Sequence, residues 1–292
     1  MAKVIYLERP LLYKPYLILG FEGWPNAAEV SSFAIRYLVE NLNARRFASI
    51  PKEDFYEMTS TRPVAVIKEG RLTELKVPRN HFYYSNDRLS RHLILFEGIE
   101  PHLRWSSYVD CLFEVVERFD VEQIFTLGGT YDYVPHTYPA LISAVFNDED
   151  LEEKVGLAGL GLTDYTGPVS IHTFIMEGAK RKGIKAISLW GHAPQYLQGR
   201  NVKVAQALLK GLSDLMGVEI DLSELRRSSE YFDQQVNHLV EGDPRLQEVI
   251  GKLEEVYRQS GRDPHSRKEE GQKDEKVVYI QAFLKRQDDE EK

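Results

Sequence analysis

The chain has 292 residues, of which 42% are hydrophobic, and its 37 basic and 45 acidic side chains give a net charge of -8. This length accommodates one α/β domain of about 200 to 250 residues with appendages, and the negative charge disfavours attraction to phosphate backbones, so we expect no nucleic-acid partner. The single cysteine, Cys111, excludes an internal disulfide framework. We predict that it is a buried apolar side chain in a reducing compartment.

Targeting and membrane segments are not expected. The first ten residues lack the apolar core of a signal peptide. No stretch approaches the ~18 consecutive apolar residues of a membrane span. The sequence therefore predicts a cytoplasmic protein without membrane attachment.

Short apolar runs alternate with amphipathic stretches over the first 130 residues. Apolar residues at spacings of three and four predict helices, and short apolar or alternating runs predict strands. The expected order is a strand at 16–21, a loop at 22–26, a helix at 30–42, a hairpin with a further strand at 63–84, a strand at 93–96, a helix at 105–119 and a strand at 123–127 that ends at Gly128 and Gly129.

The second half continues this alternation and then becomes helical. Residues 140–146 fit either a strand or a short buried helix, and the glycine-rich residues 156–161 predict no element. A helix is expected from Gly167 to a Lys182-Gly183 stop, followed by a strand at 184–190 and a helix at 202–216. From residue 221 two apolar stripes predict a helical pair, with a break at Asp243-Pro244.

These elements predict a three-layer α/β sandwich around a mainly parallel sheet. We divide the chain into a core domain at 1–222, a helical extension at 223–260 and a charged tail at 261–292, for which the composition predicts disorder. Within the tail, residues 277–284 form an apolar patch that is compatible with a docking segment, and the sequence does not assign its role.

Candidate ligand or partner residues lie beyond the carboxyl ends of the expected strands, where ligand sites of such sheets gather. This rule selects four loops, at 22–26, 97–101, 128–139 and 191–201, and a further polar segment at 163–168 precedes an expected helix. The residues are Glu22, Trp24, Asn26, Asp132, His136, Thr137, Asp164, His192 and Tyr196.

The chemistry of these residues leaves two alternatives open. Asp132 and His136 are sufficient for acid/base work if the carboxylate orients the imidazole. The same loop side chains equally fit backbone hydrogen bonds that hold the loop. No nucleophile elbow, phosphate loop or dinucleotide fingerprint is present, so we assign no catalytic residue and expect no cofactor. The eight histidines show no metal spacing, so we also expect no metal.

Three segments together resemble the proteasome assembly chaperone family, named after proteasome assembly chaperone 2, in its bacterial or archaeal form. They read GFEGWPNAAE at 20–29, VPHTYP at 134–139 and SLWGHAPQY at 188–196. The resemblance implies a fold similar to the nucleoside phosphorylase group and a homo-oligomer, for which we expect a trimer or a tetramer. Tyr138 replaces an arginine that many bacterial members carry, so an anion site built on that arginine is not expected here.

Two functions follow as expectations. The first is a non-catalytic, assembly-chaperone-like protein that binds protein partners. The alternative is an enzyme or binding protein for a nucleoside, phosphate or carboxylate ligand that uses the strand-end loops. The two are separable by asking whether Glu22, Asp132, His136 and His192 meet in one pocket.

Overall fold

A computed structural model describes residues 3–85 and 90–260 of the chain. Its centre is a nine-stranded sheet with the strand order β1-β3-β6-β7-β2-β8-β11-β9-β10. Strands β4 (Val64–Lys68) and β5 (Arg71–Lys76) form a separate two-stranded hairpin. The strands of the large sheet are β1 (Ile5–Tyr6), β2 (Tyr16–Glu22), β3 (Arg45–Ser49), β6 (His81–Ser85), β7 (Leu93–Ile99), β8 (Gln123–Asp132), β9 (Ile142–Phe146), β10 (Gly161–Leu162) and β11 (Lys185–Pro194).

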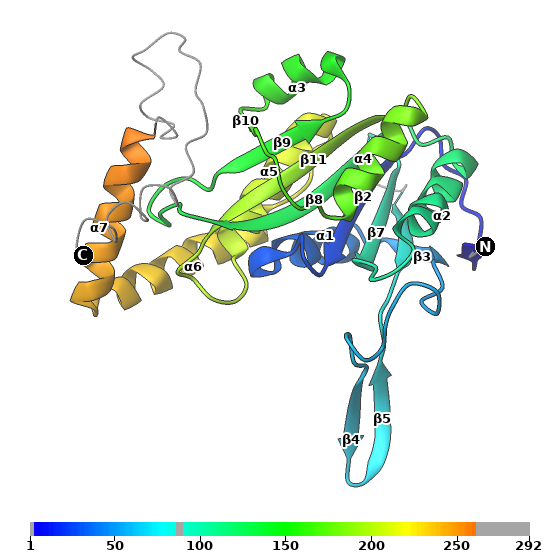
Figure 1. Ribbon diagram of the computed structural model, residues 1–292, viewed down its shortest axis with the longest axis horizontal. Coiled ribbons are helices and arrows are strands. Elements are labelled where there is room, and N and C mark those ends of the chain that lie inside the picture. The colour runs from blue at the N-terminus through cyan, green and yellow to red at the C-terminus, as the bar shows by residue number, and fades with distance from the viewer. Residues whose placement is uncertain (1–2, 86–89, 261–292) are drawn as a thin grey trace.

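The sheet is parallel at its centre, where β7, β2, β8 and β11 run side by side, and antiparallel pairs flank this core. Helices cover both faces (Figure 1). They are α1 (Val30–Asn41), α2 (Trp105–Arg118), α3 (Glu152–Leu157), α4 (Ile171–Arg181), α5 (Val202–Met216), α6 (Ser223–Glu241) and α7 (Pro244–Gln259). The predicted three-layer α/β class is thus confirmed.

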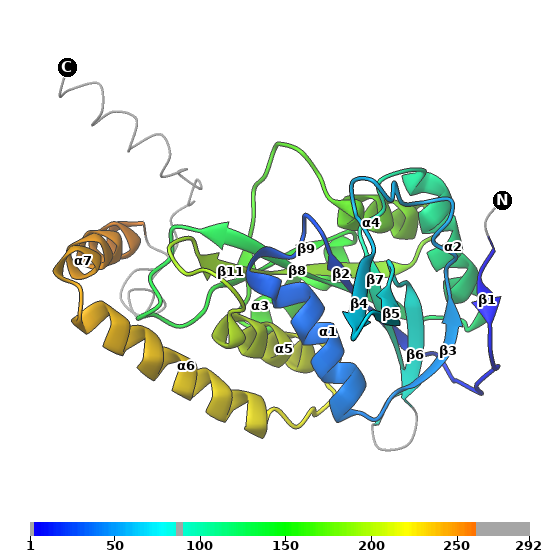
Figure 2. The ribbon, with the colours of Figure 1, turned by 90° about the horizontal axis from the view of Figure 1, so that it is seen from below.

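The alternation along β2 explains the layers. Leu17, Leu19 and Phe21 point into a buried cluster with α2 and α4, whereas Tyr16 and Ile18 join the cluster under α1 and α5. Successive side chains of a strand point to opposite faces of the sheet, so a strand that is apolar at every position is covered on both sides. Figure 2 shows the sheet between these two pairs of helices. Cys111 is buried in the first cluster, as predicted.

Strands β8 and β11 extend furthest beyond their predicted ends, and the reason is close packing at glycine. β8 continues through Gly128 and Gly129 to Asp132, paired with β11 along its whole length. A Cβ atom on Gly128 would lie 2.7 Å from the Trp190 ring, and one on Gly129 would lie 2.6 Å from the Ala27 carbonyl oxygen. These glycines therefore allow neighbours to approach the strand and do not end it.

Other boundaries also differ from expectation. Residues 140–146 contain strand β9, and the unassigned glycine-rich stretch contains the end of α3 and the start of the edge strand β10. Helix α4 begins at Ile171 instead of Gly167, because the Ser170 side chain accepts a hydrogen bond from the His172 amide and caps the helix. The segment at 163–168, including Asp164, is an exposed loop.

The helical extension follows the core without a break. Helix α6 packs on α5, and Leu225 is buried in the cluster under α1 and α5. The Asp243 carboxylate caps α7, whose first residue is Pro244, as predicted. The expected apolar stripe is incomplete, because Leu239 is exposed. The predicted disorder at 261–292 and the candidate docking segment at 277–284 lie outside the described residues.

Candidate functional site

A row of three hydrogen-bonded side chains crosses the sheet near the carboxyl ends of β8 and β11. Asp132 Oδ2 lies 2.8 Å from His192 Nδ1, and His192 Nε2 lies 2.8 Å from Ser143 Oγ. The carboxylate can only accept, so His192 donates from Nδ1 and accepts the Ser143 hydroxyl proton at Nε2. We call Asp132, His192 and Ser143 the Asp-His-Ser row.

The row corrects two sequence-based interpretations. His192 lies within β11 and not in a loop, because β11 continues to Pro194 beside the lengthened β8. Asp132 orients His192 and not His136, its predicted partner. Ser143 was not predicted as a site residue. Its strand was indistinguishable from a buried helix by sequence, and only the antiparallel pairing of β9 with β11 brings its hydroxyl to the imidazole.

The row has the connectivity of a Ser-His-Asp triad, but its surroundings differ from those of an acyl-transfer site. Ser143 is buried near the start of β9, opposite Trp190 of β11 on one side and Gly161 of β10 on the other. Its backbone therefore belongs to two ladders. An oxyanion hole requires backbone or side-chain donors directed at the reacting carbonyl, and the nucleophile's own amide is not placed to supply one.

A second network surrounds His136, which is buried in the loop after β8. Tyr196 Oη accepts from the His136 amide at 2.7 Å and donates to His136 Nδ1 at 2.6 Å. His136 Nε2 lies 3.1 Å from Asn237 Oδ1 of α6 and is its donor. This is the neutral imidazole, and burial, the largest cause, lowers the pKa of His136. Burial likewise raises the pKa of Tyr196 to about 12.

Helices α6 and α7 hold the same loop at further points. Lys203 Nζ donates to the His136 carbonyl at 2.6 Å and pairs with the Asp233 carboxylate of α6 at 2.9 Å. Thr137 Oγ1 donates to Glu254 of α7 at 2.5 Å. The rings of Tyr138 and Tyr257 meet edge to face at 5.2 Å. We call these contacts, together with that of His136 and Asn237, the α6–α7 clamp.

The end of β2 and the loop after it form a third, separate arrangement. Glu22 pairs with Arg36 of α1 at 3.4 Å, and the Asn26 side chain exchanges hydrogen bonds with Ser32. Trp24 is exposed, while its amide donates to Glu100 Oε2 at 3.2 Å. The Glu22 and Asn26 side chains and the Trp24 amide are thus bound to groups beside them, whereas the Trp24 indole is exposed.

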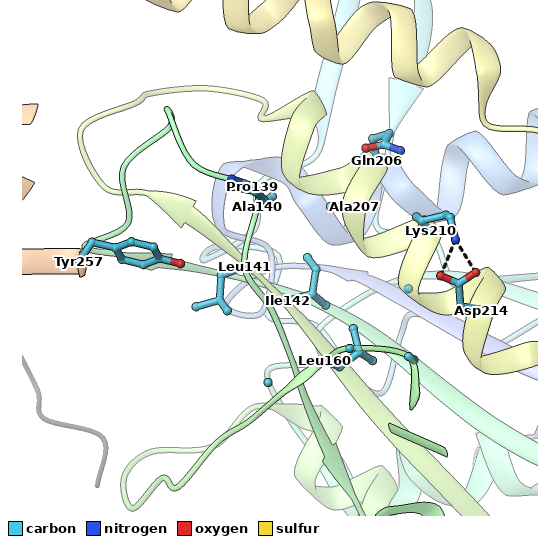
Figure 3. A pocket seen from close by; sticks show the side chains of 14 residues that line it. Pro139, Ala140, Leu141, Ile142, Leu160, Gln206, Ala207, Lys210, Asp214 and Tyr257 are labelled. Carbon is cyan, nitrogen blue, oxygen red and sulfur yellow. Dashed lines mark hydrogen bonds and ion pairs between the residues drawn. The ribbon is translucent and has the colours of Figure 1, made fainter. Parts of the chain in front are cut away.

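A cavity of about 370 Å³ opens between β9, α5 and α7 (Figure 3). Its wall is mostly apolar or glycine, with Leu141, Leu160 and Tyr257 prominent, and the Lys210–Asp214 ion pair stands at one end. None of the predicted site residues lines it. Over residues 3–85 and 90–260, no group of three His, Cys, Asp or Glu side chains is arranged to hold a metal ion.

A family model describing the PAC2 family matches residues 20–240. The chain belongs to the PAC2 family. The matched segment includes the Asp-His-Ser row, the loop around His136 and nearly all of α6, but α7 lies beyond it. Among curated proteins, none matches this chain.

Solved structures agree with this assignment. A PAC2 family protein from Streptomyces avermitilis is 30% identical with a TM-score of 0.72, over 81% of this chain and 99% of its own. A proteasome-assembly chaperone homologue from Mycobacterium tuberculosis is 26% identical with a TM-score of 0.73, over 80% and 99%. PbaB of Pyrococcus furiosus, an archaeal proteasome activator, is 22% identical with a TM-score of 0.65, over 82% and 98%, and shows the fold alone.

The predicted site residues of this PAC2 chain therefore fall into three networks and one exposed loop. Asp132 and His192 meet in the Asp-His-Ser row, while His136, Thr137 and Tyr196 are tied to the α6–α7 clamp. The residues after β2 bind to α1 and Glu100, and Asp164 lies in the exposed loop before α4. Among residues 3–85 and 90–260, no helix is long and apolar enough to cross a bilayer.

Proposed function

We propose that this chain is a non-catalytic, assembly-chaperone-like protein that acts on protein partners as a homo-oligomer in the cytoplasm. One observation carries the proposal. The loop after β8, the richest in potential acid/base residues, is engaged by the chain's own helices through the α6–α7 clamp. A loop whose polar groups are already paired offers few free groups to a small ligand.

The relatives support protein partners. One neighbour in the family is described as a proteasome-assembly chaperone homologue, and it is similar over 80% of this chain. We therefore propose a client built of subunits, with proteasome α-type subunits as the first to test. A chaperone of this kind needs an exposed surface that a subunit can cover, and exposed apolar side chains are present on the β4–β5 hairpin and on α7.

The test is in-cell crosslinking followed by affinity capture of the tagged chain, with light scattering of the purified protein in parallel. We expect a stoichiometric protein partner and a mass of three or four copies. A strictly monomeric chain that captures no stable partner would overturn the proposal. As a matched pair, Trp24→Ala and Trp105→Ala compare an exposed indole of a strand-end loop with a half-buried one. Loss of capture in the first alone indicates that this loop contacts the client.

The small-molecule alternative has one feature in its favour, the Asp-His-Ser row. A hydrolase based on Ser143 would react with an activated ester or a fluorophosphonate probe, and Ser143→Ala would abolish both reactions. We expect no such reaction, because the buried serine lacks an oxyanion donor from its own amide. Labelling of the wild-type chain that Ser143→Ala abolishes would replace the proposed function with a catalytic one.

A further inference from the structure

The β4–β5 hairpin, formed by β4 (Val64–Lys68) and β5 (Arg71–Lys76), projects from the body of the molecule (Figure 1). Its register pairs Ala65 with Leu75 and Ile67 with Leu72, with a bulge between the two pairs. Paired residues share a face of a ladder, so the four apolar side chains lie on one face. Ile67 and Leu72 are 66% and 63% exposed.

An exposed apolar face of this kind is stabilised when another protein surface packs on it. An isolated two-stranded hairpin is marginal in water, and packing against another element is what stabilises it. The other face is mixed, because it pairs Val64 with Lys76, Val66 with Glu74 and Lys68 with Arg71. Residues 62–79 contain five basic and two acidic residues, hence a local charge of +3 in a chain of net charge -8. The hairpin therefore fits an acidic surface that also exposes apolar side chains.

One surface of this chain has that character. Residues 148–153 contain five acidic side chains around the buried anchor Leu151. Beside them, α3 and the end strands expose Val145, Leu157 and Leu162, with Leu157 83% exposed. Strand β10 is the last of the sheet and pairs only with β9 among the described strands. We call this surface, residues 145–162, the acidic edge.

Helix α7 also exposes apolar side chains but lacks this complementarity. Helix α7 exposes Leu246, Val249 and Val256. It carries three basic and three acidic residues, so its formal charge is zero. Negative charge on a partner surface would attract the basic hairpin over a distance and fix its register. Helix α7 has no net negative charge and does not provide this attraction.

The hairpin and the acidic edge lie on opposite sides of the molecule, with the hairpin at the bottom of Figure 1 and α3 at the top. One chain cannot bring them together. We propose that the hairpin of one copy docks on the acidic edge of a second copy, in a head-to-tail contact that repeats from copy to copy. Such heterologous contacts form a ring when the rotation closes. This inference rests on the proposed homo-oligomer and supplies its contact surfaces.

Engineered cysteines test the contact directly, because the native Cys111 is buried. Leu72→Cys and Leu157→Cys chains are purified separately, mixed and oxidised. We expect a disulfide between the two kinds of chain and none in either chain alone. A disulfide-linked dimer of Leu72→Cys alone would show that two hairpins meet each other, and it would overturn the head-to-tail contact.

Charge reversal provides an independent test in the full chain. The Lys68→Glu/Arg71→Glu variant should raise the dissociation constant of the oligomer at least about tenfold, since it changes the charge of residues 62–79 from +3 to -1 and the acidic edge then repels the hairpin. Adding Glu152→Lys and Glu153→Lys should restore assembly. The control is Lys252→Glu on α7, which also adds negative charge but should leave the mass unchanged in light scattering.

The outcomes separate this inference from the proposed function. If the hairpin variant keeps the wild-type mass, the docking is wrong while the homo-oligomer stands. If the wild-type chain is monomeric, the homo-oligomer fails and the docking fails with it. If the variant dissociates and the four-charge variant does not reassemble, the acidic edge is not the acceptor surface, and the proposed pairing is overturned.

Discussion

The loop at 134–139 and the β4–β5 hairpin both leave the central sheet, but the rest of the chain covers the loop and leaves the hairpin exposed. The loop is polar, and Tyr196, Lys203 and two helices satisfy its hydrogen-bonding groups. The hairpin exposes an apolar face, and among the described strands it forms no ladder except its own. The comparison indicates that the enclosed segment stabilises the fold, whereas the exposed one is available to another chain.

The largest expected effect of a single substitution is in the α6–α7 clamp. Tyr257→Ala removes a buried ring that packs on Tyr138, and we expect it to lower the free energy of opening α7 by about 3 kcal/mol. Native-state hydrogen exchange over α7 and residues 134–139 measures this loss. Tyr231→Ala removes an exposed ring from α6 and should change little. Equal effects of the two variants would show that the clamp does not hold the loop.

The second prediction concerns the sheet face under α4, which we expect to be as well excluded from water as the α6–α7 clamp. His172 packs between Phe21 and Trp190, and burial lowers its pKa to about 3. The unfolded chain binds the proton near pH 6.5 and the folded chain does not, so stability present above pH 6.5 is lost as the pH falls. This group alone should remove about 2 kcal/mol between pH 7.5 and 5.

The comparison with His172→Phe isolates that contribution. Phenylalanine keeps the ring and removes the titration, so urea unfolding of the variant should lack about 2 kcal/mol of the wild-type loss between the two pH values. Other groups, such as His81, titrate in both proteins and cancel. An identical pH dependence in the two proteins would mean that His172 is not buried in the folded chain.

A smaller effect is expected where a single clamp hydrogen bond is removed. Asn237→Ala takes the acceptor from His136 Nε2, and the expected destabilisation is about 1 kcal/mol. Gln234→Ala, at an exposed position on the same helix, is the matched control. Urea unfolding at neutral pH measures both variants. The prediction is contradicted if the control loses as much stability as Asn237→Ala.

The smallest effect on the monomer is predicted in the hairpin. Leu72→Ala removes a side chain that is 63% exposed, so at dilute concentration the free energy of unfolding should change by less than about 0.5 kcal/mol. At concentrations where the oligomer forms, the same variant should lower the thermal midpoint, because binding stabilises the folded state by mass action. A large loss in the dilute chain would place the hairpin inside the monomer's own core.

The sequence predicted the layers well because they depend on local periodicity. The stripes of α2 and α5 and the doubly apolar β2 each identify their own element and its buried faces. The strand ends were predicted less well. Gly128 and Gly129 have the composition of a turn, and their role becomes visible only when Trp190 and Ala27 lie against them.

The candidate site was harder to predict because its bonds join distant parts of the chain. The residue types were informative, since Asp132 and His192 do interact. The sequence did not indicate their bonding partners. Ser143 becomes a neighbour of His192 only through the pairing of β9, and Asn237 becomes a neighbour of His136 only through the path of α6. A docking role for residues 277–284 remains a hypothesis, and the division at residue 222 remains a prediction.

The family match ends at residue 240, which divides the α6–α7 clamp between two kinds of sequence. Asp233 and Asn237 lie inside the matched segment, whereas Glu254 and Tyr257 come from the helix after it. A chain with another terminal helix, or none, would keep the sheet and the α6 contacts of the α6–α7 clamp but lose its α7 contacts. Exchanging α7 alone can thus loosen the loop at 134–139 or change its orientation.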